Sequence, residues 1–238
     1  MRLGLWGNKD LKLLTADMFE VGFRGPLGSH INFDVEIFNI QAKNANVMIT
    51  DANYVRTEGS VTIIEQPIVS TNLPLKMRQQ GVTLSLVYST KILQVKPFVT
   101  LQRTRIRDYS PYNNTPEVAP QNLYSGIGTE FTHKSTPTVF GGLSINYVPT
   151  SKININLNGY YYTKQTYHHL SNVLFNDGIR GIDTLSGKLL LNLTASYEAI
   201  KGLHVFVSGK NLLNNKSREF FRADEVPLRL MAGINFEL

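Results

Sequence analysis

Cysteine is missing from this chain of 238 residues, which excludes disulfide bridges and Cys-based zinc or thiol chemistry. No apolar run approaches the roughly 18 residues of a transmembrane helix, although 42% of the residues are hydrophobic. Residues 1–7 also lack the apolar stretch of about 7–15 residues that a signal peptide contains. If the chain is exported, we expect its export signal to lie outside this sequence.

Patterns that carry chemistry are also scarce. No serine lies in a nucleophile-elbow pattern, and no glycine-rich phosphate loop is present. His168 and His169 are adjacent in a polar segment, and adjacent histidines diverge in an extended chain, so we expect no metal site there. The net charge is +6, but the 24 Lys and Arg residues are spread along the whole chain. We therefore expect no enzymatic activity, no cofactor and no nucleic-acid partner.

Short runs of alternating apolar and polar residues, separated by turn clusters, are present instead. Side chains on a strand point alternately to its two faces, so these runs predict half-buried β-strands and an all-β fold. Asn32, Asp34 and Glu36, for example, alternate with apolar residues. Nine such runs occur, at residues 18–24, 31–37, 82–88, 92–107, 139–147, 153–157, 189–197, 203–207 and 226–238.

Short turns and long polar segments alternate strictly between these runs. The long segments cover about residues 44–76, 108–136 and 166–186; we expect all three to be outer loops and the first to be irregular. Up-and-down strands with short turns at one end and long loops at the other are typical of outer-membrane barrels. The sequence therefore predicts an antiparallel up-and-down transmembrane β-barrel section of about nine strands, open or incomplete, with a periplasmic C-terminus.

Five predicted strands run towards the periplasmic side, and the last aromatic residue of each has the parity of the apolar face. Aromatic rings favour the interface between hydrocarbon and headgroups. Five rings at one height favour a membrane girdle over the core of a soluble sandwich. The predicted girdle consists of Phe23, Tyr88, Tyr147, Tyr197 and Phe236.

On the run 92–107 the apolar parity changes from aliphatic to cationic side chains. The apolar positions end at Leu101 and are followed by Arg103, Arg105 and Arg107. This order would place three guanidinium groups at the outer headgroup level, where they suit bidentate phosphate contacts. One hypothesis is that they contact lipopolysaccharide phosphates; the alternative is a solvated basic strand end above the membrane.

The C-terminal segment 233–238 looks like the terminal assembly signal of outer-membrane barrels. Gly233 is followed by hydrophobic residues two apart, which include Phe236 and Leu238. Leu238 stands where phenylalanine is more usual. The resemblance implies that the barrel-insertion machinery reads this segment by strand pairing.

Further segments resemble one barrel family, the TonB-dependent receptors. Residues 19–24, Phe-Glu-Val-Gly-Phe-Arg, are similar to the family's Tyr-Glu-Leu-Gly strand, and a strand ending in Phe38 and Asn39 follows at the right distance. Residues 210–215, Lys-Asn-Leu-Leu-Asn-Asn, resemble the Asn-Leu-Leu-Asp segment before the final strand. The strand opening at Gly81 departs from the family pattern because Thr83 replaces an acid. The order and spacing of these motifs carry the resemblance.

The resemblance implies that residues 1–238 are the C-terminal section of a barrel of about 22 strands around an N-terminal plug, in the outer membrane of a Gram-negative bacterium. Such receptors import iron chelates, cobalamin or oligosaccharides. The TonB complex would act only through the missing N-terminal part. The expected partners are outer-membrane lipids, lipopolysaccharide and a small-molecule substrate. Tyr160 and Tyr162 have the lumen-facing parity near an outer strand end and are candidate substrate contacts.

Two other functions stay open at this point. One is a small self-closing barrel acting as a passive pore or adhesin, although single-chain bacterial barrels usually have an even strand count. The other is a soluble β-sandwich that binds glycans, because sandwich strands alternate in the same way. A nine-strand section on its own would have two open edges, so we expect a curved open sheet that neither inserts stably nor transports.

Overall fold

A computed structural model describes residues 2–50, 54–72, 75–108, 131–169, 181–220 and 223–236. Within these ranges the chain forms β-strands, and none of its segments is a helix long and apolar enough to cross a membrane. The chain divides into two compact units. The first comprises Met1–Phe19, Asn39–Gln79 and Thr104–His133, and the second comprises Glu20–Phe38, Gln80–Arg103 and Lys134–Leu238.

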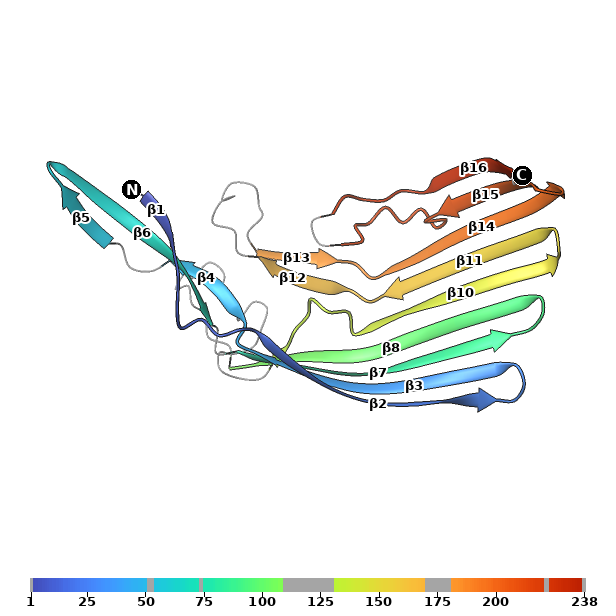
Figure 1. Cartoon of the computed structure of the whole chain (residues 1–238), viewed down its shortest axis with the longest axis horizontal. Coiled ribbons are helices and arrows are strands. Elements are labelled where there is room, and N and C mark those ends of the chain that lie inside the picture. The colour runs from blue at the N-terminus through green and yellow to red at the C-terminus, as the bar shows by residue number, and fades with distance from the viewer. Residues whose placement is uncertain are drawn as a thin grey trace. The chain divides into compact units, whose positions relative to one another are not determined.

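Nine antiparallel strands follow one another in a single sheet, in the order in which they occur along the chain (Figure 1). This is the predicted up-and-down connectivity, and all nine predicted strands are confirmed. The first strands extend beyond the predicted runs, whereas the last begins a few residues later. The strands are β2 (Thr15–Leu27), β3 (Ile31–Lys43), β7 (Lys76–Ser89), β8 (Leu93–Arg107), β10 (Val139–Thr150), β11 (Ile153–Tyr162), β14 (Lys188–Ile200), β15 (Leu203–Lys210) and β16 (Arg229–Phe236).

Four short turns join β2 to β3, β7 to β8, β10 to β11 and β14 to β15, all at one end of the sheet (Figure 1). Gly28 (φ 77°) and Gly202 (φ 80°) adopt the left-handed conformation in two of these turns, which glycine enters without steric cost. In a third turn, the hydroxyl of Thr90 accepts the N–H of Leu93 at 3.0 Å. We call this end of the sheet the turn end.

Strand register sorts the side chains of this sheet into two faces. Tyr147 pairs with Leu93 on one side and with Ile155 on the other, so apolar positions of three strands are aligned. The apolar face consists of the odd-numbered positions of the nine strands, except for β7 and β16, where it consists of the even-numbered ones. Register shifts near the turn end of β10 and β14 change this parity, so that Thr150 pairs with Ile153 and Ile200 with Leu203. The remaining positions form the polar face, where Asn154 pairs with Ser196.

The apolar face is exposed despite its composition. Phe19 is 68% exposed, Phe23 66% and Ile234 71%. A soluble β-sandwich would bury such a face against a second sheet, so the sandwich alternative does not fit this structure. An exposed apolar surface of this extent indicates contact with lipid or with another protein.

Residues 44–76, predicted to be irregular, instead contain three strands of a second sheet, which lies in the first unit. These are β4 (Asn46–Thr50), β5 (Tyr54–Glu58) and β6 (Val61–Asn72), and β1 (Arg2–Trp6) completes the sheet. Gly59, with a φ of 62°, lies in the tight turn between β5 and β6.

Two features explain why the sequence pattern did not predict this sheet. The β-branched run at the start of β6 favours a strand, but Pro67 and the polar residues around it resemble a loop. In addition, β1 pairs with β6 in parallel, Arg2 with Glu65 and Trp6 with Val69, across a sequence separation that leaves no local signal.

The segment 166–186, predicted to be a long outer loop, contains two short strands. It contains most of β12 (Gln165–His169) and all of β13 (Gly181–Leu185), which pair antiparallel. Thr166, Tyr167, Ile182 and Thr184 are residue types that favour strands, but the runs are too short to show clear alternation. Of the segment 108–136, residues 109–130 lie outside the described part, and β9 (Phe131–Thr132) pairs with β8.

Candidate functional site

Three aromatic side chains from adjacent strands meet on the polar face of the second unit. They are Phe98 on β8, Phe140 on β10 and Tyr160 on β11, and we call them the aromatic cluster. The ring centroid of Phe98 lies 6.4 Å from that of Phe140 and 6.0 Å from that of Tyr160, both in edge-on geometry. Tyr160 is 47% exposed. The cluster therefore offers ring surface for stacking and a hydroxyl for hydrogen bonding.

Gly142 makes room for this cluster. In the strand register it lies opposite both Phe98 and Tyr160. A Cβ atom at position 142 would lie only 2.5 Å from the ring of Phe98. Because glycine has no side chain, the ring of Phe98 can lie across β10 and reach both of its aromatic neighbours.

Tyr162, the other predicted contact residue, has different surroundings. It is 8% exposed, and its hydroxyl donates a hydrogen bond of 3.4 Å to the backbone carbonyl of Glu219. Its register partner Lys188 is buried; its Nζ donates to the carbonyl of Ser217 at 2.6 Å and lies 3.5 Å from Oε1 of Glu219. A buried ammonium group needs such a carboxylate. Tyr162 and Lys188 thus hold residues 217–219 against the polar face, whereas Tyr160 stays accessible.

The connection from β15 to β16 begins with two asparagines that turn the chain. Asn211 and Asn214 have φ values of 52° and 47°, in the left-handed region that asparagine enters more readily than most residues. The backbone N–H of Asn211 donates to Oδ1 of Asn192 in β14 at 2.9 Å, and its Nδ2 donates to the carbonyl of Val226 at 2.7 Å. The Asn-Leu-Leu-Asn motif is therefore a structural turn that fastens this connection to β14.

A hollow of about 600 Å³ lies on the polar face near the turn end. Its lining includes Asn154, Ser196, His204 and Asn235, from four adjacent strands. These amide, hydroxyl and imidazole groups can offer several hydrogen bonds to an occupant, and Val148, Ile153 and Phe206 add apolar surface to the lining.

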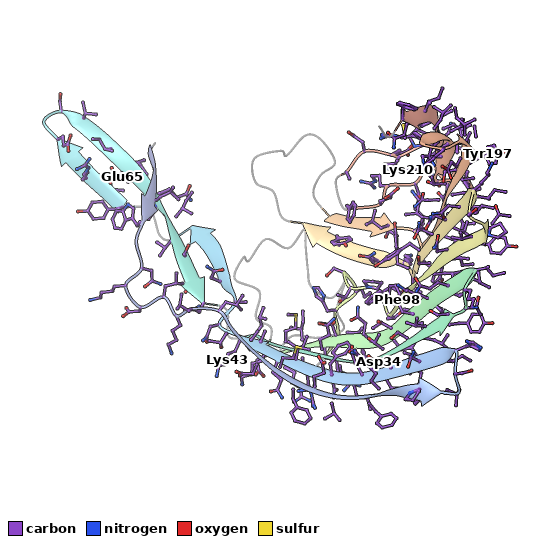
Figure 2. The ribbon with its side chains drawn as sticks, turned by 45° about the vertical axis from the view of Figure 1, so that its right-hand side comes forward. Asp34, Lys43, Glu65, Phe98, Tyr197 and Lys210 are labelled. Carbon is purple, nitrogen blue, oxygen red and sulfur yellow. The ribbon has the colours of Figure 1, made fainter. Side chains whose placement is uncertain are left out.

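The five predicted girdle residues lie on the apolar face, close to the turn end. Figure 2 shows one of them, Tyr197, on the face of the sheet opposite to Phe98. Their contact with a membrane interface, and their common height in it, stay a prediction. The exposed fraction of the side chain is 66% for Phe23, 37% for Tyr147, 49% for Tyr197 and 58% for Phe236. Tyr88 is half-buried.

Two of the three predicted assembly-signal residues lie in β16. Gly233 is on the polar face, where a Cβ atom would lie 2.6 Å from the ring of Phe206. Phe236 is on the apolar face opposite Leu203. Leu238 lies outside the described residues. Recognition of this strand by the insertion machinery stays a prediction.

The three arginines of β8 follow the predicted parity. Arg103 and Arg107 are exposed and Arg105 is half-exposed, whereas Thr104 and Ile106 between them are buried. Alternation therefore continues past the apolar positions of this strand. In the described part of the chain, no group of three or more His, Asp or Glu residues could hold a metal ion.

Sequence reasoning singled out Tyr160 but missed Phe98, Phe140 and Lys188. The polar-face parity of both phenylalanines was readable from the alternation of their strands. Their contact with Tyr160 was not, because it depends on the register between three strands.

Comparison with known proteins assigns a family to this architecture. Residues 3–212 match the model of the family described as TonB dependent receptor-like, beta-barrel. No curated protein matches the chain.

Solved structures share the fold at low sequence identity. The FrpB iron transporter from Neisseria meningitidis (F3-3 variant) is 18% identical, with a TM-score of 0.60 over 98% of this chain and 32% of its own. The siderophore receptor PirA from Acinetobacter baumannii is 16% identical, with a TM-score of 0.66 over 98% of this chain and 33% of its own. The ferripyoverdine receptor of the outer membrane of Pseudomonas aeruginosa is 16% identical, with a TM-score of 0.61 over 93% of this chain and 27% of its own.

This chain thus spans about a third of the length of these proteins. The family match covers most of the chain, and the up-and-down order of the nine strands agrees with it. The chain therefore belongs to the TonB-dependent receptor-like β-barrel family.

Proposed function

We propose that residues 1–238 form the C-terminal section of the barrel wall of an outer-membrane receptor in a Gram-negative bacterium, and that this receptor takes up a ferric chelate. The observation that carries the proposal is the division of the nine-strand sheet into an exposed apolar face and a polar face. In a transmembrane barrel the first faces lipid and the second faces the lumen.

The length of the apolar face supports a membrane location. On β8, apolar-face positions are aliphatic or proline from Leu93 to Leu101. Eight residues span about 27 Å along a strand, or roughly 20 Å across a membrane at a tilt of about 40°. The apolar band of such barrels is about 25 Å tall. The girdle residues at the turn end would then lie at the periplasmic interface.

A ferric chelate is favoured because the solved structures similar to this chain include an iron transporter, a siderophore receptor and a ferripyoverdine receptor. Those names belong to the other proteins. TonB-dependent receptors also import cobalamin or oligosaccharides, and the uptake test below includes both as alternative cargoes.

Within the lumen, we assign substrate contact to the aromatic cluster. Planar or aromatic groups of a chelate can stack on Phe98 and Tyr160, and the exposed hydroxyl of Tyr160 can donate a hydrogen bond. The polar hollow near the turn end would dock the plug domain, through which the TonB complex acts. Both the plug and the remaining strands lie outside these residues.

Adjacent tyrosines provide a matched test. Tyr160 lies on the polar face and Tyr161 on the apolar face, and the two are 47% and 45% exposed. The assay measures uptake of radiolabelled ferric chelates by cells whose receptor carries this chain together with its plug and remaining strands. We expect Tyr160→Ala to weaken chelate binding, which would raise the chelate concentration for half-maximal uptake by about two- to tenfold, the range for one lost aromatic contact. Tyr161→Ala should leave binding unchanged.

Equal effects of the two substitutions would remove the cluster from the substrate site. Accumulation of cobalamin or an oligosaccharide, without any ferric chelate, would overturn the proposed cargo. Gel shifts on heating, measured for both variants, control for folding of the barrel.

A further inference from the structure

A basic hollow lies on strands β2, β3, β7 and β8 of the first unit. Its volume is about 190 Å³. Four cationic residues line it, and all four are exposed. They are Lys43, Lys76, Arg78 and Arg107.

All four cations occupy apolar-face parity on their strands. On β3 the apolar positions end at Ile37 and are followed, after two polar residues, by Lys43. On β7 the even positions from Val82 to the turn are apolar, while Arg78 and Lys76 precede them. On β8, the apolar positions are likewise followed by Arg103, Arg105 and Arg107. The change from apolar to cationic side chains therefore occurs on β3, β7 and β8.

The number of strand residues between these cations and the turn end is similar on β7 and β3. Arg78 is ten residues from the girdle residue Tyr88 on β7, which corresponds to about 33 Å along the strand. At a tilt of about 40°, this is roughly 25 Å across the membrane, the full height of the apolar band. Lys43 is twelve residues from Ile31 on β3, or about 40 Å along the strand. The cations would therefore reach the outer headgroup level.

Neighbouring polar groups contact two of these cations, Arg78 and Lys76. The Nε of Arg78 donates to Oδ1 of Asn39 at 2.8 Å, which holds the guanidinium on this face. Lys76 forms an exposed ion pair with Asp108 at 3.1 Å, a type of contact that water and salt weaken. Asp17 also lines the hollow. The lining of the hollow thus includes four cations and one carboxylate.

The feature is confined to one part of the sheet. On β10, β11 and β14, no lysine or arginine occupies an apolar-face position. A general excess of surface charge would not select three adjacent strands and one face. The pattern instead indicates a local binding site for an anion at the outer edge of the hydrophobic band.

We propose that this hollow binds a phosphate group of lipopolysaccharide in the outer leaflet. The proposal rests on the membrane location proposed above. The phosphate would accept hydrogen bonds from Arg78 and Arg107 and lie close to the ammonium groups of Lys43 and Lys76, since arginine suits bidentate phosphate contacts. The acyl chains of the same lipid would run along the apolar residues of β3, β7 and β8 towards the turn end.

The test uses the complete receptor, in which this chain is joined to its plug and remaining strands, as isolated from outer membranes in mild detergent, with co-purifying lipopolysaccharide quantified per receptor. The variant Lys43→Gln/Lys76→Gln/Arg78→Gln removes three cations. Each cation near an anionic lipid surface contributes about fivefold in affinity, so we expect bound lipopolysaccharide and lipid A affinity to fall at least tenfold. The matched control, Lys91→Gln/Lys201→Gln, removes cations from two short turns at the other end of the sheet and should retain the lipid.

Different ligands distinguish the phosphate of a lipid from free inorganic phosphate. Bisphosphorylated lipid A should bind more tightly than dephosphorylated lipid A, and millimolar inorganic phosphate should not compete. Equal competition by inorganic phosphate would show a free-anion site and overturn the lipid assignment. Equal lipid retention by the triple variant and the control would overturn the site itself.

A charge-conserving variant, Lys43→Arg/Lys76→Arg/Arg78→Lys, controls for misfolding, because it should retain the lipid that the glutamine variant loses. Loss of lipid from both triple variants would indicate a structural cause and overturn the charge assignment. A complete wild-type receptor that is absent from the membrane fraction would instead contradict the proposed function, and the inference with it. Membrane partitioning with equal lipid retention in all variants would contradict the inference alone.

Discussion

At the scale of single residues, phenylalanine and glycine are paired across neighbouring strands of the polar face. In each pair, a Cβ atom on the glycine would lie 2.4–2.6 Å from the phenylalanine ring. A ring that lies over glycine covers a position without a side chain and helps to fix the strand register. The pairs are Phe38 with Gly81, Phe98 with Gly142 and Phe206 with Gly233.

The pair in the last hairpin gives a prediction. Gly233→Ala places a methyl group against the ring of Phe206, and we expect a stability loss of about 1–3 kcal/mol, as for other overpacked sites. Urea titration of the folded protein in detergent measures this loss. In a Phe206→Ala background the clash is absent, so the same substitution should cost much less. An equal cost in both backgrounds would show that the ring does not set the requirement for glycine.

At the scale of elements, the connection between β15 and β16 is held by side chains of other strands. Tyr162 and Lys188 contact its residues 217–219, and Asn192 binds Asn211 at its start. These contacts come from β11 and β14, so they attach the connection to the wall at two places. The connection is therefore part of the polar face.

Removal of the buried ammonium group should release this connection. Lys188→Met leaves the carbonyl of Ser217 and the carboxylate of Glu219 without their donor. Because Glu219 retains partial exposure, we expect local opening to become easier by about 1–3 kcal/mol, less than for a fully buried pair. Hydrogen exchange of residues 215–220 measures it. Lys201→Met, in an exposed turn, is the control, and equal exchange in both variants would contradict the proposed attachment.

At the scale of the whole molecule, the nine-strand sheet has an open path. In the part of the chain that the structure describes, β2 and β16 each pair with a single neighbour in this sheet. Unpaired strand edges offer backbone groups to other chains. A wall of nine strands thus needs further strands before its backbone is satisfied in a membrane.

For the 238 residues expressed alone, we expect assembly into higher oligomers in detergent and no discrete conductance in planar bilayers. The open edges of β2 and β16 would pair with other copies instead of closing a pore. Light scattering after size exclusion and single-channel recording measure these two properties. A stable monomer with a defined conductance step would support the small stand-alone barrel instead.

Local alternation was sufficient to locate the nine strands of the sheet and to assign their faces. Side-chain parity is a property of each strand by itself, so Tyr160 and Phe236 could be placed on opposite faces before any pairing was known. Alternation also placed Arg103 beyond the apolar band. It could not identify β12 and β13, because runs of five residues are too short to show a clear period.

Only the tertiary structure decided which strands lie opposite each other residue by residue. The contact of Phe98 with Tyr160, the burial of Lys188 under residues 217–219 and the parallel pairing of β1 with β6 all join distant segments. Such contacts depend on register and on backbone pairing, which leave no trace in local composition. The sequence by itself thus determined the strands, their faces and the family resemblance, whereas the fold determined the aromatic cluster and the basic hollow.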